Sequence, residues 1–380
     1  MKHIMIICGE PSGDINAASL IYAIRERDTQ IKISGAGGRF MRQAGAQLFY
    51  DIENLAVIGF FDVLKKLPQF FALKKLILQK IKQEQPGAVI LVDFSGFNLR
   101  LAKEINNTAP VIYYISPQIW ASRTGRIKTI KKYISKMIVL FKFEEELYKK
   151  HGVNVDFAGH PLIDIVKPTM KKKEFTNQFK LSESKTTICL LPGSRKTEIE
   201  YILPVMLKSA ILIRREIPNT QFIIAKSPQL NLDLYTHKIN AAGIDIQIIE
   251  GKTYDCLNIA DFALIASGTA TLEAALMQTP FIVIYKMSLL NYLLYRPQVK
   301  VPYIGMVNIV AGEKIIPEFI QFEAKPQNIS REALKILHQP AEMAVMKKDL
   351  SLIEPLLGAA GAAKRAAEII MGYLIDKEKT

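Results

Sequence analysis

The chain has 380 residues, of which 49% are hydrophobic and 23% charged, so it is long enough for about two folded domains and is not a disordered chain. Fifty Lys and Arg against 36 Asp and Glu give a formal net charge of +14. This balance favours an anionic partner, which could be nucleic acid, a phosphorylated substrate or an acidic membrane surface.

The cysteines and the apolar segments exclude several other classes. Cys8, Cys189 and Cys256 are far apart and lack metal-ligand spacing, so we expect reduced core residues in a cytoplasmic protein. The N-terminus has no signal-peptide pattern, and no apolar run is long enough to predict a helix that spans a membrane.

Short apolar runs alternate with longer helical patterns along the chain. Helical spacing appears at residues 15–27, 98–107, 197–216 and 269–277. Continuous apolar strands that alternate with helices predict parallel sheets covered on both faces. The predicted strands are 2–8, 31–34, 87–92, 110–115, 137–141, 155–158, 186–191, 221–225, 246–249, 262–266 and 281–285.

The strand–helix pattern restarts at residue 186, after a polar, lysine-rich stretch at 167–185 that we interpret as a linker. We therefore predict an α/β protein with two doubly wound domains, 1–166 and 167–345. A helical segment at 346–380 is expected to pack on the N-terminal domain or on a second subunit, which leaves a homodimer open.

In open parallel sheets, ligands bind at the carboxyl ends of the strands, so the first strand–helix turn is informative. It reads GEPSGD (9–14), where Gly9 and Gly13 permit a tight turn and close approach of a ligand. Ser12 or Asp14 can cap the next helix, and the carboxylates of Glu10 and Asp14 can accept hydrogen bonds from sugar hydroxyls. A capped turn without a ligand is the alternative interpretation.

Two later turns of the first domain also carry polar groups. Asp93 follows a very apolar strand in VDFSGFN, where a partly desolvated carboxylate suits a general base, although Asp93 could also be a helix cap. Asn98 could cap a helix or orient a ligand. Trp120, Arg123 and Arg126 in SPQIWASRTGR could bind nucleic acid or a phosphate-bearing lipid, although a solvated basic face is the commoner outcome.

Two turns of the second domain suit a nucleotide diphosphate. In LLPGSRKTE (190–198), backbone amides near Ser194 at a helix start and the fork of Arg195 could hold a pyrophosphate. In IASGTATLEAAL (265–276), Gly268, Thr269 and Ala270 form a second turn of small residues. Glu273, one helical turn further on, could accept both ribose hydroxyls. A capped helix and a solvent-facing glutamate are the alternatives.

Residues 57–83 are dense in Phe and Leu with interleaved lysines, a pattern typical of a basic amphipathic helix in a membrane interface and also of a core helix with a lysine rim. Residues 287–300 are a weaker candidate of the same kind. His160 is most simply structural. The sequence has no Asp-x-Asp pair and no His/Cys cluster, so we expect no metal and no cofactor.

Eight motifs in order resemble one family over residues 3 to about 375: GEPSGD, SGAGGRFMRQAG, VDFSGFN, SPQIWASR, FAGHPLID, LPGSRKTEI, SGTATLEAAL and VNIVAGEKIIPEFIQ. Together they resemble lipid-A-disaccharide synthases. The resemblance implies a GT-B glycosyltransferase with two Rossmann-like domains that face a cleft. It also implies a cytoplasmic enzyme that is peripheral at the inner membrane.

The implied reaction transfers 2,3-diacylglucosamine from its UDP conjugate to 2,3-diacylglucosamine 1-phosphate (lipid X). It forms a β-1′,6-linked disaccharide with inversion and releases UDP. Residues 57–83 would meet the anionic membrane surface.

The resemblance also implies roles for the candidate residues. Asp93 would be the catalytic base, with Glu10 and Asp14 as the reserves. Further acceptor-side residues would be Ser12, Asn98, Arg123 and Arg126, the two arginines receiving the 1-phosphate. The UDP-binding residues would be Ser194, Arg195, Gly268, Thr269, Ala270, Glu273 and Asn308.

The chain departs from the family pattern at two places. Val307 stands before Asn308 where a proline is expected, and FSGF follows Asp93 where a loop with Pro or Ala is expected. Both departures bear on local loop shape.

Three other functions stay open from the sequence. The first is an enzyme of the same fold with another UDP-sugar, such as an epimerase or a peptidoglycan glycosyltransferase. The second is a non-catalytic module that binds nucleotide sugars at membranes. The carboxylates at the cleft turns favour catalysis over binding alone. Nucleic-acid binding would explain the charge but not the two phosphate-suited turns, so we expect no nucleic-acid partner.

Overall fold

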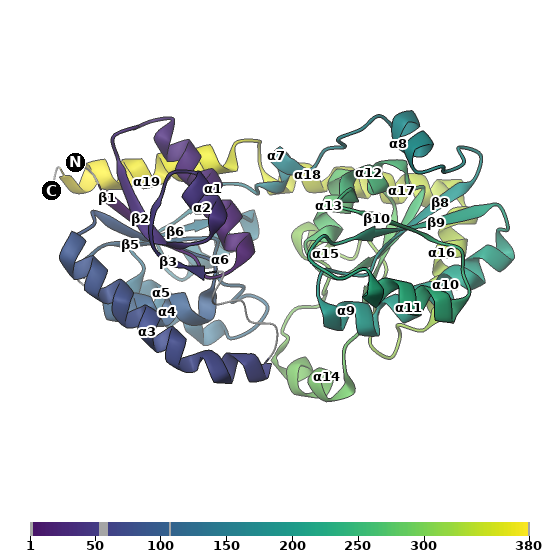
Figure 1. Ribbon diagram of the computed structural model, residues 1–380, viewed down its shortest axis with the longest axis horizontal. Coiled ribbons are helices and arrows are strands. Elements are labelled where there is room, and N and C mark those ends of the chain that lie inside the picture. The colour runs from purple at the N-terminus through teal and green to yellow at the C-terminus, as the bar shows by residue number, and fades with distance from the viewer. Residues whose placement is uncertain (1–2, 53–59, 106–107, 379–380) are drawn as a thin grey trace. The chain divides into compact units, whose positions relative to one another are not determined.

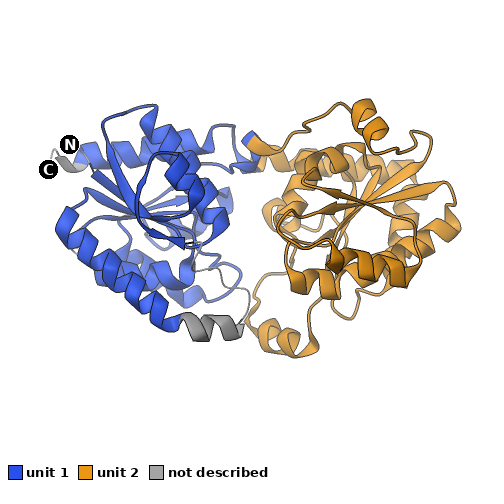
Figure 2. Ribbon diagram, viewed as in Figure 1, with its two compact units in different colours: residues 1–164, 357–380 blue, residues 165–356 orange. Residues whose placement is uncertain are grey.

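A computed structural model of the chain describes residues 3–52, 60–105 and 108–378, with only the backbone for 60–66 and 377–378. It divides into two compact units (Figure 2). Unit 1 comprises Met1–Asp164 and Leu357–Thr380, and unit 2 comprises Ile165–Leu356. Each unit has a parallel sheet with helices on both faces (Figure 1).

The sheet of unit 1 has seven parallel strands in the order β3-β2-β1-β4-β5-β6-β7. Its central strands β1, β4 and β5 are buried along their whole length, which explains their continuous apolar sequences. The strands are β1 (His3–Ile7), β2 (Lys32–Gly37), β3 (Gln47–Asp51), β4 (Ala88–Val92), β5 (Val111–Tyr114), β6 (Lys136–Val139) and β7 (Val155–Phe157).

The main helices of unit 1 connect these strands, and the last of them comes from the end of the chain. They are α1 (Pro11–Arg25), α2 (Arg39–Gln43), α3 (Phe60–Glu84), α4 (Ser95–Ile105), α5 (Ile127–Tyr133), α6 (Lys142–Lys150), α7 (Leu162–Ile165) and α19 (Ala362–Glu378). Helix α19 packs on α1 of the same chain, and its buried face includes Ala362, Ala366 and Ala367, whose small side chains allow close approach.

The sheet of unit 2 has six parallel strands in the order β10-β9-β8-β11-β12-β13. The strands are β8 (Thr186–Leu191), β9 (Thr220–Lys226), β10 (Gln247–Glu250), β11 (Phe262–Ala266), β12 (Phe281–Tyr285) and β13 (Glu318–Ile320). The helices are α8 (Lys172–Gln178), α9 (Lys196–Tyr201), α10 (Leu203–Glu216), α11 (Asp233–Ala242), α12 (Thr253–Ile259), α13 (Ala270–Leu276), α14 (Leu289–Tyr295), α15 (Met306–Ala311), α16 (Pro326–His338), α17 (Pro340–Ser351) and α18 (Ile353–Leu357).

The structure differs from the sequence prediction in three local features. Strands β3 and β13 were not predicted, because both are short edge strands with few fully buried residues. The predicted helix at 197–216 is two helices that meet at Ile202, with Pro204 in the first turn of the second. The stretch interpreted as a linker contains α8, which packs on α12 and buries Phe175 within unit 2.

Two features bear on the function classes set out above. All three cysteines are buried free thiols. Among the helices that the structure describes, none combines the length and the apolar character needed to cross a membrane.

Each sheet has one point where the strand order reverses. In unit 1, β1 and β4 are neighbours, and the chain runs outward from them in both directions. In unit 2, the corresponding pair is β8 and β11. A crevice opens at the carboxyl ends of such a strand pair, which makes it the usual ligand site in open α/β sheets.

Candidate active site

The predicted acceptor turns of unit 1 lie at its strand-order reversal. The turn GEPSGD follows β1, and Asp93 follows β4, which pairs with β1. The turns approach closely, since a Cβ atom on Gly9 would lie 2.2 Å from the ring of Phe94. Glycine at position 9 is therefore a steric requirement for bringing the two turns together.

The backbone is strained at Asp93. Asp93 and Phe94 both have a φ of +48°, in the left-handed region that Asp tolerates and Phe rarely adopts. The surrounding structure holds this turn, since the carbonyl of Asp93 accepts hydrogen bonds from Tyr113 Oη at 2.5 Å and from Asn98 Nδ2 at 2.8 Å. Both partners are fully buried. Strain of this kind is typical of functional turns.

The carboxyl group of Asp93 has an unusual proton affinity. Burial, followed by the negative charge of Glu10, raises the pKa of Asp93 to about 6, while the backbone N–H of Phe94 opposes the shift. A carboxylate with such a pKa is still ionised at pH 7 and takes a proton more readily than an exposed aspartate. These are the properties of a general base.

The residues of GEPSGD divide into exposed and buried groups. The side chains of Glu10 and Ser12 are exposed at the turn. Asp14 is only 3% exposed, and its carboxylate accepts hydrogen bonds from the backbone N–H groups of Gly38, Phe40 and Met41 at 2.8, 2.9 and 3.2 Å. We expected Asp14 to meet a sugar hydroxyl; its carboxylate instead holds the start of α2.

Asn98 is a second predicted ligand group that the structure uses internally. Its side chain is fully buried, and Nδ2 also donates to the carbonyl of Val92 at 3.2 Å. Asn98 therefore fixes the end of β4 and the carbonyl of Asp93. We infer that it acts on any ligand through the position of Asp93.

The predicted phosphate arginines lie on the next segment along the chain. Arg126 Nη1 donates to Ser95 Oγ, 3.1 Å away, at the start of α4. Burial and the nearby charges of Arg123 and Arg100 lower the pKa of Arg126. An anion beside Arg126 would offset the burial and the like charges that lower its pKa, and the phosphate site stays a prediction.

Sequence reasoning missed one buried acid, Glu144 on α6. Its carboxylate accepts hydrogen bonds from Ser116 Oγ at 2.8 Å and from Trp120 Nε1 at 3.0 Å, and burial raises its pKa to about 7. Glu144 therefore holds the segment that leads to Arg123 and Arg126. The run FEEELY carries no signal that tells this acid from the adjacent Glu145, which pairs with lysines.

The diphosphate turn of unit 2 follows β8, at the reversal of its sheet. The backbone N–H groups of Ser194 and Arg195 donate to Glu198 Oε2 at 2.8 and 3.1 Å, and Arg195 Nη1 contacts Glu198 Oε1 at 2.9 Å. Glu198 thus occupies the donors that we predicted for a diphosphate. The side chain of Arg195 is 79% exposed.

The second nucleotide turn follows β11, the strand beside β8. Gly268 has a φ of +156°, and Thr269 is exposed. Glu273 on α13 lies near Tyr254, whose hydroxyl donates to Glu273 Oε1 at 3.5 Å, and burial raises the pKa of Glu273. A half-buried carboxylate with one weak partner can still accept hydrogen bonds from a diol.

Asn308 on α15 was predicted to lie near the phosphates or the sugar. Its side chain is fully buried, and Oδ1 accepts hydrogen bonds from the N–H groups of Ile315 and Ile316 at 3.0 and 2.9 Å. Its Nδ2 donates to Glu318 Oε1 at 2.8 Å and to the carbonyl of Ile316 at 2.9 Å. Asn308 therefore fixes the loop around α15 and has no free polar group to offer a ligand.

One pocket of the described residues is not lined by these turns. A pocket beside β13, α16 and α17 is lined by several acids, including Glu323, Glu332 and Glu342, which makes it unsuitable for a diphosphate. Among the residues with described positions, no group of His, Cys, Asp and Glu could hold a metal ion.

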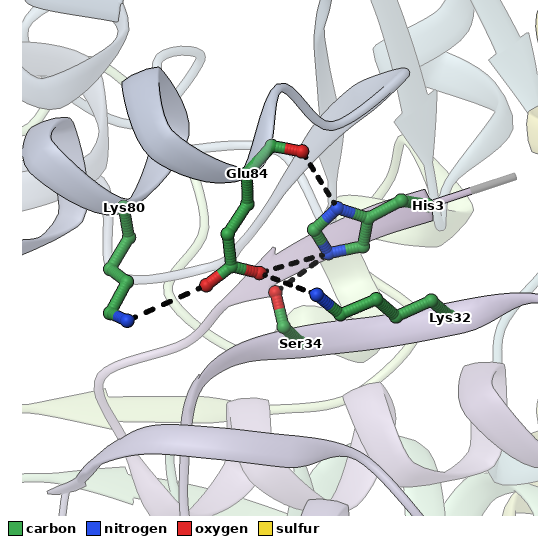
Figure 3. Close-up of polar contacts among 5 residues, drawn as sticks. All are labelled: His3, Lys32, Ser34, Lys80 and Glu84. Carbon is green, nitrogen blue, oxygen red and sulfur yellow. Dashed lines mark hydrogen bonds and ion pairs between the residues drawn. The ribbon is translucent and has the colours of Figure 1, made fainter. Parts of the chain in front are cut away.

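A polar cluster joins the amino ends of β1 and β2 to the end of α3 (Figure 3). His3 Nε2 lies 2.8 Å from Ser34 Oγ, and Glu84 Oε2 lies 3.1 Å from Lys32 Nζ. Because the predicted site lies at the opposite, carboxyl ends of the strands, this cluster stabilises the sheet and takes no part in the site.

Solved structures of an epimerase and of a glycosyltransferase share the fold over nearly the whole chain. UDP-GlcNAc 2-epimerase from Neisseria meningitidis, bound to UDP-GlcNAc, superposes with a TM-score of 0.64 at 13% identity, covering 99% of this chain and 100% of that one. A glycosyltransferase from Rickettsia africae superposes with a TM-score of 0.59 at 11% identity, covering 98% of both chains. The fold is therefore the GT-B type, which confirms the predicted fold class.

The sequence comparisons define the family. The family model for lipid-A-disaccharide synthetase matches residues 4–367. Lipid-A-disaccharide synthase from Syntrophus aciditrophicus is 43% identical over 368 residues, covering 96% of each chain, and the enzyme from Coxiella burnetii is 37% identical over 376 residues, covering 99% of each. The chain belongs to the lipid-A-disaccharide synthase family and is a glycosyltransferase, as the motifs predicted.

Proposed function

We propose that this enzyme transfers 2,3-diacylglucosamine from UDP-2,3-diacylglucosamine to the 6-hydroxyl of lipid X. The O6–C1 bond forms as the C1–O bond to UDP breaks, and the bonding electrons leave with UDP. The base takes the proton of the 6-hydroxyl. A single displacement of this kind inverts the anomeric carbon and yields a β-1′,6-linked disaccharide 1-phosphate.

Asp93 is the proposed base. The observation that carries this role is its position at the strand-order reversal of unit 1, with a strained backbone and a pKa raised to about 6. Glu10 is the reserve, because it is exposed on the neighbouring turn and its charge reaches Asp93. Asp14 is the weaker reserve, since three backbone N–H groups already bind its carboxylate.

The acceptor is held by the other polar groups of unit 1. Ser12 is exposed on the same turn as Glu10 and can bond to the acceptor sugar. Arg123 and Arg126 receive the 1-phosphate, whose negative charge offsets the burial and the repulsion from Arg123 that lower the pKa of Arg126. Asn98 keeps Asp93 in place through the carbonyl of Asp93.

The donor is held by unit 2. The guanidinium of Arg195 and the amides near Ser194, Gly268, Thr269 and Ala270 stabilise the diphosphate as it gains charge, and Glu273 binds the ribose. Charge stabilisation of this type is often the largest catalytic contribution, with a single donor contributing about 3 kcal/mol. Asn308 supports this site indirectly, because Ser267 Oγ donates to the carbonyl of Ile304 in the loop that Asn308 and Glu318 fix.

The donor assignment is tested by Arg195→Ala, with Arg215→Ala as the matched control, since Arg215 is also exposed and lies in the last turn of α10. Turnover with UDP-2,3-diacylglucosamine and lipid X in detergent micelles should fall by about a hundred-fold for Arg195→Ala. The control should keep wild-type turnover. Equal turnover of both variants would refute the role of Arg195.

We further propose that the enzyme works as a peripheral protein on the cytoplasmic face of the inner membrane, with residues 57–83 on the anionic surface. Residues 57–59 of this segment lie outside the described residues, and only the backbone of 60–66 is described. Further along α3, Leu67 and Phe71 are 36% and 61% exposed. A homodimer stays a prediction.

A further inference from the structure

The short helix α14 in unit 2 has no buried residue, although its sequence is LLNYLLY. Leu289, Leu290, Leu293 and Leu294 are 53%, 69%, 59% and 59% exposed. At about 100° per residue, these four leucines share an arc of about 140° on the helix. We call this group the α14 patch. Contiguous exposed leucines are a signature of an interaction surface, since scattered ones would need no explanation.

Aromatic side chains flank the α14 patch. Tyr295 is 48% exposed, and Phe322, which is 61% exposed, stacks edge-on against Tyr292 with ring centroids 5.7 Å apart. Aromatic rings beside a cluster of aliphatic side chains are typical of segments that enter the boundary between lipid head groups and acyl chains.

The helix is fixed to the body of unit 2 at its first residues. Ser288 Oγ caps it by accepting a hydrogen bond from the N–H of Asn291. The side chain of Gln321 accepts a hydrogen bond from the backbone N–H of Met287 at 3.1 Å and donates one to the carbonyl of Met287 at 3.0 Å. Since Tyr285 is the last residue of β12 and Gln321 directly follows β13, α14 projects from the carboxyl ends of the strands, where the nucleotide turns also lie (Figure 1).

All charged residues in the sequence on either side of α14 are basic. Residues 274–312 contain Lys286, Arg296 and Lys300 and no Asp or Glu. The adjacent acid Glu323, next to Phe322 in sequence, lines the acidic pocket beside β13. Apolar side chains with basic residues at their margin are complementary to an anionic lipid surface, which accepts both.

A protein partner fits the patch less well. A stable protein interface buries roughly 1,200–2,000 Å², whereas α14 is a helix only about 10 Å long. Leucine is also under-represented among the residues that dominate protein interfaces. A bilayer needs neither a large area nor shape complementarity.

We propose that the α14 patch inserts into the anionic bilayer surface and is a membrane contact of unit 2, separate from the segment at 57–83. The leucines enter the acyl boundary, and Arg296 and Lys300 bind the head groups. This contact holds the sheet edge with the nucleotide turns at the lipid surface. The inference rests on α14 itself and does not need the proposed reaction.

The test is co-sedimentation of the full chain with phosphatidylcholine vesicles, with and without phosphatidylglycerol. Leu290→Gln/Leu294→Gln should lower the partition coefficient on anionic vesicles by at least about ten-fold, because two leucine side chains no longer leave water. Arg296→Gln/Lys300→Gln should lower the partition coefficient on anionic vesicles by about five-fold per charge removed. The partition coefficient on neutral vesicles should not change. The matched control is Leu232→Gln/Leu352→Gln, since both are exposed leucines of unit 2 that do not belong to α14.

Three further readings make the result decisive. Thermal unfolding should be the same for all variants, since every changed side chain is exposed. Phe71→Gln weakens only the membrane contact at 57–83. Its effect on partitioning can therefore be distinguished from the effect of losing the α14 contact. Turnover in detergent micelles reports the proposed reaction, and the α14 variants should retain it.

Two outcomes would overturn the proposal. One is wild-type partitioning of Leu290→Gln/Leu294→Gln on anionic vesicles. The other is sedimentation velocity without lipid showing a dimer that the same substitutions dissociate, which would assign the patch to a second copy of the chain.

Discussion

Replacing Asn308 by alanine should destabilise unit 2 without removing any group that binds UDP. The side chain makes four hydrogen bonds, to the two N–H groups of Ile315 and Ile316, to the carbonyl of Ile316 and to the carboxylate of Glu318. Ile316 is fully buried, and Glu318 is only 9% exposed. Alanine removes all four bonds at once.

The magnitude follows from the groups that are left without a partner. Each buried group that loses its hydrogen bond costs about 1–3 kcal/mol, and a water that enters the space recovers part of this loss, so the total is about 3 kcal/mol. For a unit of this size, 1 kcal/mol corresponds to roughly 2–4 °C in Tm, which predicts a decrease of about 6–12 °C.

The assay is differential scanning calorimetry of the full chain, with and without UDP. Thr269→Ala is the matched control, because Thr269 is exposed on a nucleotide turn, and its unfolding should change by less than about 0.5 kcal/mol. An unchanged Tm for Asn308→Ala together with weaker UDP binding would refute the reasoning and place this side chain in contact with the ligand.

Three further predictions concern other groups. Asp14→Ala should lower the Tm of unit 1 by calorimetry, because three N–H groups lose their acceptor; an unchanged Tm would return Asp14 to the acceptor site. Glu198→Gln should tighten UDP binding by about three- to ten-fold in titration calorimetry, because a competing charge leaves the diphosphate donors; weaker binding would contradict the competition. The contribution of His3 to stability should be lost as the pH falls below about 6.5, because burial lowers the pKa of His3, and the unfolded chain therefore binds its proton first. The pKa of Glu84 is also lowered, because Lys32 outweighs the burial that would raise it. The contribution of Glu84 to stability is therefore also lost as the pH falls, at lower pH than that of His3. Thermal unfolding from pH 8 to pH 5 checks this, and an equal pH dependence in His3→Gln would contradict it.

The sequence predicted the features that depend on local pattern. Continuous apolar runs identify the buried central strands, and the turns after them place Asp93, Ser194 and Thr269 at strand ends. The edge strands β3 and β13 were missed because an edge strand needs neither burial on both faces nor great length.

The sequence could not predict which polar residues serve the fold. Asp14 binds N–H groups 24–27 residues away, and Glu144 binds side chains 24–28 residues away. Such pairings depend on the tertiary structure. Asp14, Asn98 and Asn308 look like ligand groups in the sequence because a buried structural acid or amide uses the same chemistry as a binding one.

The pairing of Glu198 with the amides of Ser194 and Arg195 shows the same limit at shorter range. A glutamate in the first turn of a helix predicts a favourable interaction with the N-terminal amides. The same amides predict an anion site. The sequence alone does not decide which anion occupies them.

The central claim is transfer of the sugar to lipid X with Asp93 as the base. Its most direct test is the detergent-micelle assay with UDP-2,3-diacylglucosamine and lipid X, comparing wild type with Asp93→Asn from pH 5 to pH 8. Asparagine is the suitable replacement because it also tolerates the φ of +48° at this position.

The account predicts disaccharide from the wild type, with a rate that falls as the pH drops through about 6, where Asp93 takes up its proton. It predicts a loss of about a hundred-fold or more for Asp93→Asn. Wild-type turnover by the variant would move the base to another residue. No disaccharide from either protein, with UDP still bound, would contradict the reaction itself.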